Sequence, residues 1–303
     1  MISVVIPTYK NKENFLKNLE NNYPILSKYQ IIIINDNPTI SLKKNLANYK
    51  NLILLENKKN LGFGASVNLG VGLAKYNYIL LLNDDVILDK NNNFAKLIFL
   101  FKNNPKLFAV SFAQKERRGK ITGKNILYWR SGMIHHREAF DLKEGDNGWA
   151  EGGASLIDKD KFLALGGFDD LYYPFYWEDI DLSFRAWKRG YQLVFNPTVL
   201  VKHHHETTIG KYFSYDFIKT IAFRNQFIFV WKNITDKKLL FDHFFRLFGN
   251  LIYYGIIKKQ PYFIFGFLKG LLLIPKIFKR KNYEKKYFMV KDEEILNKFN
   301  QKI

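Results

Sequence analysis

Two adjacent carboxylates, Asp84 and Asp85, stand with Asn83 at the end of an apolar run, residues 78–82 (YILLL). The run has no polar face, which predicts a buried central strand of a parallel sheet, and such sheets bind ligands at the carboxyl ends of their strands. Carboxylate oxygens in this place suit a Mg²⁺ or Mn²⁺ ion that also holds substrate phosphates. Taken alone, the three polar residues are better explained by a turn, because Asn and Asp favour turns.

A second pair of carboxylates, Glu178 and Asp179, opens a segment in which Ile180, Phe184 and Trp187 recur at helical spacing. Acids in the first turn of a helix complement its dipole, which is the simplest explanation of the pair. The residues just before the pair are aromatic and predict a pocket wall for a sugar: Tyr172, Tyr173, Phe175, Tyr176 and Trp177. A carboxylate at the rim of that pocket could remove a proton from an incoming hydroxyl.

Two runs of histidines are further candidates for chemistry. His203 begins a run of three after residues 198–201, which favour a strand. Neutral imidazole is a competent ligand for Mn²⁺, so His203 could complete a metal site with Asp85, although a solvated loop is the simpler explanation of such a run. His135 and His136 have no carboxylate at a suitable spacing, and we assign them no role.

These side chains need a scaffold, and the apolar pattern indicates an α/β fold. Four apolar runs have the length and spacing of buried strands: 3–7, 30–34, 52–55 and 78–82. Three stretches between them favour helices: 12–22, 42–49 and 65–75. This order predicts an open, mostly parallel, Rossmann-like sheet flanked by helices, with right-handed crossovers.

The ends of the first strands also carry polar residues. Residues 7–9 (PTY) end the first strand, and Asp36 follows the second. Gly62 and Gly64, in the loop before a helix, could let the backbone approach a phosphate or a ribose. Asp36 could accept a hydrogen bond from a base or ribose, or form an Asx turn before Pro38, and both alternatives stay open.

The segment after the fourth strand is less regular. Residues 94–102 favour a helix and 107–112 a strand. Residues 114–146 are polar and basic, and they predict a long irregular loop at the carboxyl edge of the sheet. Such an insertion is a candidate for binding an acceptor.

Taken in order, these segments resemble the family 2 glycosyltransferases of the GT-A fold, and most of all their bacterial rhamnosyltransferase-like branch. The resemblance covers roughly residues 1–231 and rests on VVIPTY, NLGFGASVN, LLLNDD, EGGASL, LGGFDD, YWEDIDLSFR and VKHHH. Several motifs in a fixed order are more specific than any one of them.

The resemblance assigns roles to individual residues. The nucleotide-sugar donor is expected to bind at Pro7, Thr8, Tyr9, Asp36, Asn60, Gly62, Asn83, Asp84 and Arg224, the last as a contact to its diphosphate. Residues 83–85 match the Asp-x-Asp metal motif, with Asn83 in place of the first Asp, which leaves Asp85 and His203 as the expected metal ligands. Asp179 matches the general base and Glu178 its catalytic partner. The acceptor pocket is expected at Gly152, Gly153, Tyr176 and Trp177.

The resemblance also implies a reaction. It is an inverting, Mg²⁺- or Mn²⁺-dependent transfer of a sugar, such as rhamnose, from a dTDP or UDP donor to a glycan or lipid-linked glycan in cell-surface polysaccharide synthesis. The alternative is a catalytically inert protein of the same fold that binds a nucleotide sugar or a membrane surface. A nucleotidyltransferase would carry a glycine- and basic-rich loop after the first strand, and residues 9–13 contain no glycine.

Composition narrows the partners. The 303 residues include no cysteine, which excludes disulfides, zinc thiolate sites and thiol nucleophiles. The start of the chain, MISVVIPTYK, lacks the features of a signal peptide and favours a core strand. The net charge of +19 implies an anionic partner, and no nucleic-acid-binding motif accompanies it.

More than half of this charge lies in the last part of the chain. Residues 232–303 contain sixteen Lys and Arg against six Asp and Glu, a balance of +10. Their apolar runs are shorter than the roughly 20 residues of a spanning helix, and Lys258, Lys259 and Lys269 interrupt them. We therefore expect a catalytic domain at 1–231 and a helical, basic and aromatic region at 232–303 on the anionic, cytoplasmic face of the cell membrane. The alternatives are a helical pair packed on the catalytic domain, a mixture of both arrangements, or a hairpin dipping into the bilayer.

Overall fold

The computed structural model describes residues 1–117, 119–203 and 208–300. Its described strands form a ten-stranded sheet in the order β10-β12-β6-β11-β4-β1-β2-β3, with β5 beside β12 and β7 beside β6, and a separate two-stranded sheet of β8 and β9. The strands have these bounds: β1 (Ile2–Thr8), β2 (Gln30–Asn35), β3 (Leu52–Glu56), β4 (Tyr78–Leu82), β5 (Val86–Leu88), β6 (Leu107–Lys115), β7 (Ile121–Thr122), β8 (Asn125–Arg130), β9 (Met133–Glu138), β10 (Gly145–Asp146), β11 (Ala154–Asp158) and β12 (Gln192–His203).

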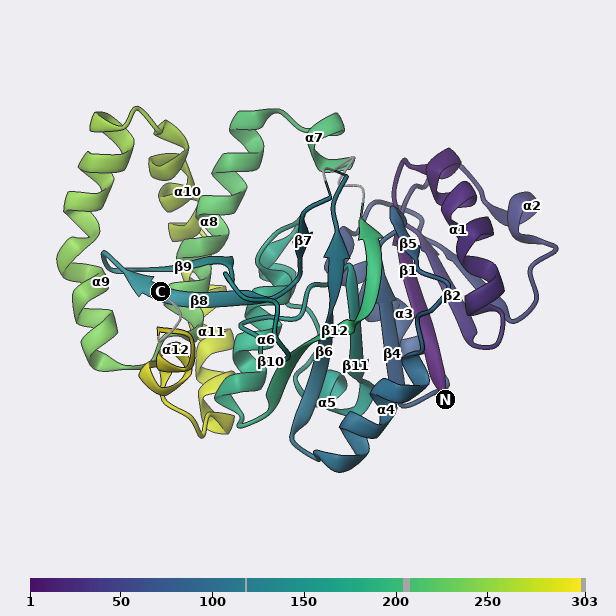
Figure 1. The fold of residues 1–303 in the computed structure, drawn as a ribbon. Coiled ribbons are helices and arrows are strands. Elements are labelled where there is room, and N and C mark those ends of the chain that lie inside the picture. Colours follow the sequence, from purple (N-terminus) through teal and green to yellow (C-terminus); the bar gives the residue numbers. More distant parts are fainter. Residues whose placement is uncertain (118, 204–207, 301–303) are drawn as a thin grey trace.

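Helices cover both faces of the large sheet (Figure 1). They have these bounds: α1 (Lys12–Leu26), α2 (Lys43–Leu46), α3 (Phe63–Leu73), α4 (Phe94–Asn103), α5 (Lys159–Ala164), α6 (Glu178–Lys188), α7 (Thr208–Tyr212), α8 (Tyr215–Asn233), α9 (Lys237–Asn250), α10 (Pro261–Leu271), α11 (Ile274–Glu284) and α12 (Asp292–Asn300). Short 3-10 turns occur at η1 (Asp170–Tyr172) and η3 (Lys285–Tyr287), and η2 (Leu251–Ile257) is a π-helix.

The predicted mostly parallel sheet is confirmed. β1 pairs in parallel with β2 and β4, and β2 pairs in parallel with β3. β4 is central, as expected, but its other neighbour, β11, runs antiparallel. β3 lies at the edge of the sheet and is only half-buried, so the expectation that residues 52–55 form a fully buried strand was wrong. An edge strand reaches fewer covering helices, which explains its exposure.

Alternate side chains of the central strands fill two different cores. Val4 and Leu80 face the layer that contains α1 and α4, whereas Val5 and Leu81 face the layer that contains α3, α5, α6 and α8. The alternation follows from the two-residue repeat of a strand. It explains why these strands are apolar on both faces and why the polar residues gather at their carboxyl ends.

The segment 114–146 is not the irregular loop that we expected. β8 and β9 form an antiparallel hairpin, and its turn at Ser131 and Gly132 has positive φ angles of 51° and 76°. Ile126 and Ile134 of the hairpin are buried in the core that also contains α8. Gln226 of α8 donates a hydrogen bond to the Ile134 carbonyl, which helps to hold the hairpin on the domain.

The C-terminal helices share a core with the rest of the chain. The expected boundary at 231/232 falls inside α8, and the Lys232 ammonium is buried between Asp181 at 2.8 Å and Asp169 at 2.6 Å. At Gly266 of α10, a Cβ atom would lie 2.8 Å from the Arg224 backbone nitrogen, so α8 and α10 approach closely. For these helices the structure shows packing on the catalytic domain, which was given above as an alternative to a region held on the membrane surface.

The buried cations of α6 extend this connection. Lys188 pairs with Asp292 of α12 at 2.5 Å, and Arg189 pairs with Glu284 of α11 at 2.7 Å. The hydrophobic core includes residues of α9, α10, α11 and α12, which are Leu239, Phe263, Ile277 and Ile295. The two parts of the chain are therefore joined by a shared helix, buried ion pairs and a common core.

Within the described residues, a single helix that is long and apolar enough to cross a membrane is not found. One pair of helices passes the same test by length and composition, Pro261–Leu271 with Ile274–Tyr287, and the pair is bent by 69°.

Candidate active site

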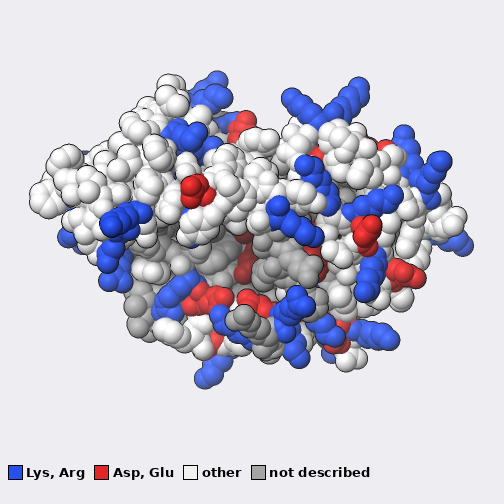
Figure 2. All heavy atoms as spheres, turned by 90° about the horizontal axis from the view of Figure 1, so that it is seen from above, with Lys and Arg blue, Asp and Glu red and all other residues white. Residues whose placement is uncertain are grey.

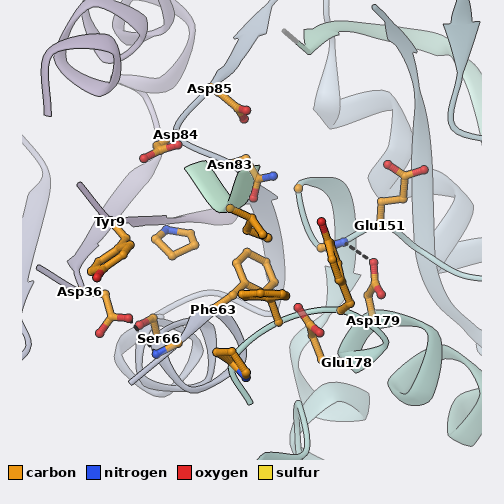
Figure 3. A pocket seen from close by; sticks show the side chains of 18 of the residues that line it. Tyr9, Asp36, Phe63, Ser66, Asn83, Asp84, Asp85, Glu151, Glu178 and Asp179 are labelled. Atoms are coloured by element: carbon orange, nitrogen blue, oxygen red, sulfur yellow. Dashed lines mark hydrogen bonds between the residues drawn. The ribbon is translucent and has the colours of Figure 1, made fainter. Parts of the chain in front are cut away.

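A cavity of about 560 Å³ opens at the carboxyl ends of β1, β2 and β4. Figure 3 shows Tyr9, Asp36 and Ser66 along one side of it and Glu178 and Asp179 on the other. The predicted site residues that line the cavity are Pro7, Thr8, Tyr9, Asp36, Asn60, Gly62, Asn83, Asp84, Asp85, Gly152, Gly153, Tyr176, Glu178, Asp179 and His203. The structure thus brings together residues from widely separated parts of the sequence.

Asp36 organises the loop before α3. Its carboxylate accepts hydrogen bonds at 2.8 Å from the Asn57 side chain and from the backbone N–H groups of Leu61 and Gly62. Burial raises the pKa of Asp36 despite these bonds. The Asx turns in this stretch belong instead to Asn35 and Asn37, which accept bonds from the backbone two residues ahead. Asp36 therefore does not form the turn before Pro38, and it stays at the cavity wall.

Asp84 ties the ends of β1 and β4 together. Its oxygens accept hydrogen bonds from the Thr8 hydroxyl at 2.6 Å and from the Asn11 side chain at 3.1 Å. Burial raises the pKa of Asp84 to about 7, even though the bond from Thr8 opposes the rise. Asp84 thus fixes the wall of the cavity, and its neighbour Asp85 points elsewhere.

Asp85 and His203 meet, as the metal hypothesis requires. His203 Nε2, from the end of β12, lies 3.1 Å from Asp85 Oδ1. This buried oxygen has no hydrogen-bond partner of good geometry among the described residues. Burial alone would lower the pKa of His203, but the adjacent Asp85 carboxylate outweighs this effect and the pKa is raised. A buried carboxylate oxygen without a hydrogen bond, beside an imidazole nitrogen, fits a divalent cation.

Asp85 and His203 alone do not make a complete set of protein ligands for a metal ion. Within ranges 1–117, 119–203 and 208–300, groups of three or more His, Asp or Glu side chains that could hold a metal ion are not found. Mg²⁺ usually keeps several waters and binds through one or two carboxylates plus substrate phosphates, so a pair is enough for such an ion. The rest of the histidine run, 204–205, lies outside the described residues.

Asp179 and Glu178 stand at the start of α6, as predicted. Asp179 Oδ1 accepts the N–H of Ile180 at 2.8 Å, and Oδ2 accepts the N–H of Gly152 at 3.5 Å. Burial raises the pKa of Asp179 to about 6, and the negative charge of Glu151 adds to the rise. Burial also raises the pKa of Glu178 well above its usual range, and the charge of Asp179 strengthens the effect. Both carboxyl groups therefore bind a proton more tightly than ordinary carboxyls do, and the pKa of Asp179 lies at about 6.

Two adjacent glycines in the turn before β11 let that turn approach the end of β4 and the start of α3. A Cβ atom at Gly153 would lie 2.5 Å from Asn83 Nδ2, and one at Gly152 would lie 2.8 Å from the Phe63 ring. The Asn83 backbone N–H donates to the Gly153 carbonyl at 2.9 Å. The glycines therefore allow the metal-site residues and the α6 carboxylates to face the same cavity.

Two predicted residues do not line the cavity. The Trp177 ring packs between His136 and Phe229. The Arg224 guanidinium, on α8, donates to the Tyr173 carbonyl and to Asn225 Oδ1. This geometry does not favour an acceptor contact for Trp177 or a diphosphate contact for Arg224, since both groups are used within the fold.

Sequence reasoning missed other residues at the cavity. Glu151 lines it and accepts hydrogen bonds from Gln114 and from Asn125. His136, to which we assigned no role, also lines it, from β9. Desolvation by the surrounding protein lowers the pKa of His136 to about 4, although its ring remains accessible from the cavity, so it is neutral at physiological pH. The sequence did contain a signal for Glu151, because an acid directly precedes the two glycines Gly152 and Gly153. The position of His136 at the cavity could be found only once the β8–β9 hairpin was known.

Comparison with known sequences identifies the family. The profile described as Glycosyl transferase family 2 matches residues 3–165. The poly-beta-1,6-N-acetyl-D-glucosamine synthase of Staphylococcus aureus is 26% identical over 204 residues, which are 66% of this chain and 48% of that protein. The N-acetylglucosaminyl-diphospho-decaprenol L-rhamnosyltransferase of Mycobacterium tuberculosis is 34% identical over 77 residues, 25% of each chain. The chain thus spans about half the length of the first relative.

Solved structures show the same fold. GalNAc-T7, crystallised with UDP, GalNAc and Mn²⁺, matches with a TM-score of 0.63 at 16% identity and covers 91% of this chain and 57% of its own. The mannosyltransferase PcManGT of Pyrobaculum calidifontis, in complex with GDP-Man and Mn²⁺, matches with a TM-score of 0.55 at 13% identity over 89% and 86% of the two chains. TarS 1–349 of S. aureus matches with a TM-score of 0.54 at 12% identity over 99% and 91%. Together the profile, the sequence relatives and the shared fold establish that the chain belongs to glycosyl transferase family 2 and adopts the GT-A fold.

Proposed function

We propose that this protein transfers a sugar from a nucleotide-diphosphate donor to a hydroxyl of a glycan or lipid-linked glycan in the synthesis of a cell-surface polysaccharide. The observation that carries the proposal is the ionised carboxylate of Asp179, whose pKa is about 6, facing the same cavity as the Asp85–His203 pair. By their names, the two bacterial relatives make a polysaccharide and glycosylate a lipid-linked sugar. A general base with a pKa near the working pH is effective in proton transfer.

The donor occupies the side of the cavity formed by Thr8, Tyr9, Asp36 and the loop at Gly62. Backbone near Gly62, with φ of 83°, can approach a ribose or phosphate closely because glycine has no side chain. dTDP and UDP are the proposed nucleotides, and rhamnose is one candidate sugar. Support for a nucleotide-sugar donor comes from the fold neighbours, whose structures contain UDP or GDP-Man.

The acceptor occupies the side formed by Gly152, Tyr176 and the start of α6. Asp179 removes the proton from its hydroxyl, and the oxygen attacks the anomeric carbon on the face opposite the nucleotide. A single displacement of this kind inverts the anomeric centre. Burial and the charge of Asp179 raise the pKa of Glu178, which favours its protonated form, so its proposed role beside Asp179 is that of a hydrogen-bond donor.

Asp85 and His203 would hold a Mg²⁺ or Mn²⁺ ion. Such an ion, when bound, supplies Lewis-acid stabilisation for the negative charge of the departing diphosphate. Asn83 and Asp84 line this wall of the cavity and are proposed to contribute to binding of the donor. Support for a divalent cation comes from the orphaned Asp85 oxygen and from the fold neighbours crystallised with Mn²⁺.

A panel of sugar nucleotides tests the proposed donor class. With the correct donor at ten times its Kd, we expect about 1.4 kcal/mol of added stability, together with slow donor hydrolysis. Thermal unfolding and release of the nucleoside diphosphate are the measurements. Stabilisation without any hydrolysis or transfer would support the inert binding protein instead, and neither effect with any donor would contradict both functions.

The proposed membrane contact is the outer face of α9. The helix has two apolar faces: Leu239 and Leu247 pack into the core, while Phe244, Phe245 and Phe248 are 60%, 75% and 74% exposed. A cluster of large exposed apolar side chains beyond the face that is packed into the core marks a surface for interaction with lipid or protein. In Figure 1 α9 is the outermost helix at its end of the molecule, so this face points away from the domain.

Charge favours a bilayer as the occupant of this face. Between Lys237 and Tyr283 the only acidic residue is Asp242. Exposed lysines stand at both ends of the unit formed by α9 and η2, at 237–238 and 258–259. Figure 2 shows few charged groups over this end of the molecule, with Lys and Arg around it. Apolar rings surrounded by cations match an anionic lipid surface, where each basic residue contributes about 1 kcal/mol. These features support our proposal that the protein lies at the cytoplasmic face of the cell membrane.

Replacing two of these rings tests the contact. We expect Phe244→Ser with Phe248→Ser to reduce flotation with anionic liposomes, because two large apolar groups no longer enter the lipid. The matched control is Phe99→Ser with Leu163→Ser, which removes side chains that are 63% and 51% exposed on α4 and α5. Equal flotation of both double variants would contradict a role for α9, and self-association of the wild type in solution would point to a second copy as the occupant.

A further inference from the structure

A fully buried glutamine connects the two halves of the cavity. Gln114, near the end of β6, has no exposed surface. Its Nε2 donates to Glu151 Oε2, and its Oε1 lies 2.7 Å from His203 Nδ1. The other ring nitrogen of His203, Nε2, lies beside Asp85. The negative charge of Glu151 raises the pKa of Asp179. A single amide therefore lies between the proposed metal ligands and the proposed base.

The amide has only one consistent orientation. A carboxylate only accepts hydrogen bonds, so the Gln114 NH₂ group must face Glu151. This leaves the amide oxygen for His203, and because that oxygen only accepts, His203 Nδ1 must carry a proton. A neutral His203 then has its lone pair at Nε2, the nitrogen beside Asp85. That is the form of histidine that binds a metal ion, and such ligands are commonly fixed by a hydrogen bond at the other nitrogen.

The same amide holds Glu151 in place. Glu151 Oε1 accepts from Asn125 of β8 at 2.9 Å, so the carboxylate is clamped between β6 and the hairpin. The clamped carboxylate adds negative charge beside Asp179. Its position keeps Asp179 a stronger base than an ordinary aspartate.

We infer that Gln114 is a positioning residue that couples the two halves of the site: it fixes His203 in its metal-binding tautomer and holds the Glu151 carboxylate beside Asp179. The inference rests on the proposed function, but both of its tests measure binding or titration and need no sugar transfer. Gln114 touches neither the donor nor the acceptor, since it does not line the cavity.

Gln114→Met removes both hydrogen bonds at nearly constant volume. We expect Mn²⁺, added without donor, to bind 10- to 100-fold more weakly, as titration followed by electron paramagnetic resonance would show. We also expect the pKa of Asp179, followed by ¹³C NMR of its carboxyl carbon in metal-free protein, to fall from about 6 toward the ordinary value for Asp. The resonance is assigned by its absence in Asp179→Asn. A residue that only filled the core would change neither quantity.

Gln226→Met is the matched control, because Gln226 is also a buried glutamine with a backbone hydrogen bond, on α8. It should leave both measurements unchanged. Glu151→Gln separates the two halves and stands in if Gln114→Met does not fold: it should lower the pKa of Asp179 and leave Mn²⁺ affinity within a few-fold of wild type. Unchanged Mn²⁺ affinity in folded Gln114→Met, or an unchanged Asp179 pKa in Glu151→Gln, would overturn the inference. A failure of the proposed function would appear differently, as no transfer by the wild-type protein with these binding results intact.

Discussion

Asp179→Asn is expected to lower sugar transfer by about 10² to 10⁴-fold while nucleotide binding and folding persist. The amide cannot accept the acceptor proton, but its single oxygen can still accept the short hydrogen bond from Ile180. Only the long contact with Gly152, at 3.5 Å, loses its acceptor. Loss of a carboxylate from the first turn of a helix costs under about 1 kcal/mol of stability, so the loss in rate would be chemical and not structural. The measurements are transfer rate, donor affinity and thermal unfolding of the same preparation.

The pH dependence provides an independent check on Asp179. A base must be ionised, and its pKa is raised to about 6, so transfer by the wild-type protein should decline as the pH falls through 6. An ordinary aspartate would hold its activity to much lower pH. Near wild-type turnover in Asp179→Asn would show that the base is elsewhere, and Glu151→Gln would then be the next variant, because Glu151 is the other carboxylate at that wall.

The second large effect is expected at the proposed metal pair. Asp85→Ala and His203→Ala should each weaken binding of the donor in the presence of Mn²⁺ or Mg²⁺ and sharply reduce transfer, since Lewis-acid stabilisation of a leaving group is worth several kcal/mol. The two losses should not add in the double variant, because both side chains serve one ion. Donor affinity with and without metal, measured by calorimetry, tests this directly.

Asn91→Ala is a suitable control, as Asn91 is an exposed residue on the loop after β5, outside the cavity lining. It should behave as wild type in both assays. Full activity in excess chelator would rule out the cation, and it would direct attention to the protein's own cations as stabilisers of the diphosphate. Asn83 stands where the resemblance predicts the first acid of an Asp-x-Asp motif, which makes the chelator experiment especially informative.

The sequence predicted the strands and much of the site for one physical reason. Parallel strands end at the same edge of a sheet, so polar residues after apolar runs converge, and Thr8, Asp36 and Asp85 line one cavity. Strand and helix patterns are local, which is why β4 and the start of α6 lie where the sequence placed them. His203 could be joined to Asp85 because it follows an apolar strand directly.

The rest depended on long-range packing. Glu151 reaches the cavity from the turn before β11, and His136 reaches it from the β8–β9 hairpin. The residues next to them in the sequence do not determine where these two segments lie in the fold. Trp177 was misassigned because it and Tyr176 both have positive φ, 74° and 71°, an uncommon backbone form for large residues. That turn sends the two neighbouring rings to different places, one to the cavity and the other into the core.

The buried pairs between α6 and the C-terminal helices limit how the protein can be dissected. A chain shortened to Asn233 would lose Asp292 and Glu284, the partners of Lys188 and Arg189, and would expose the core that Phe263 and Ile295 share with the rest of the chain. The C-terminal region, which carries the proposed lipid contact, therefore cannot be cut off as a free attachment. Since α6 carries Asp179 at its other end, the bilayer, the helix and the reacting hydroxyl would keep a fixed geometry, and the enzyme would reach acceptors only at one height above the lipid surface.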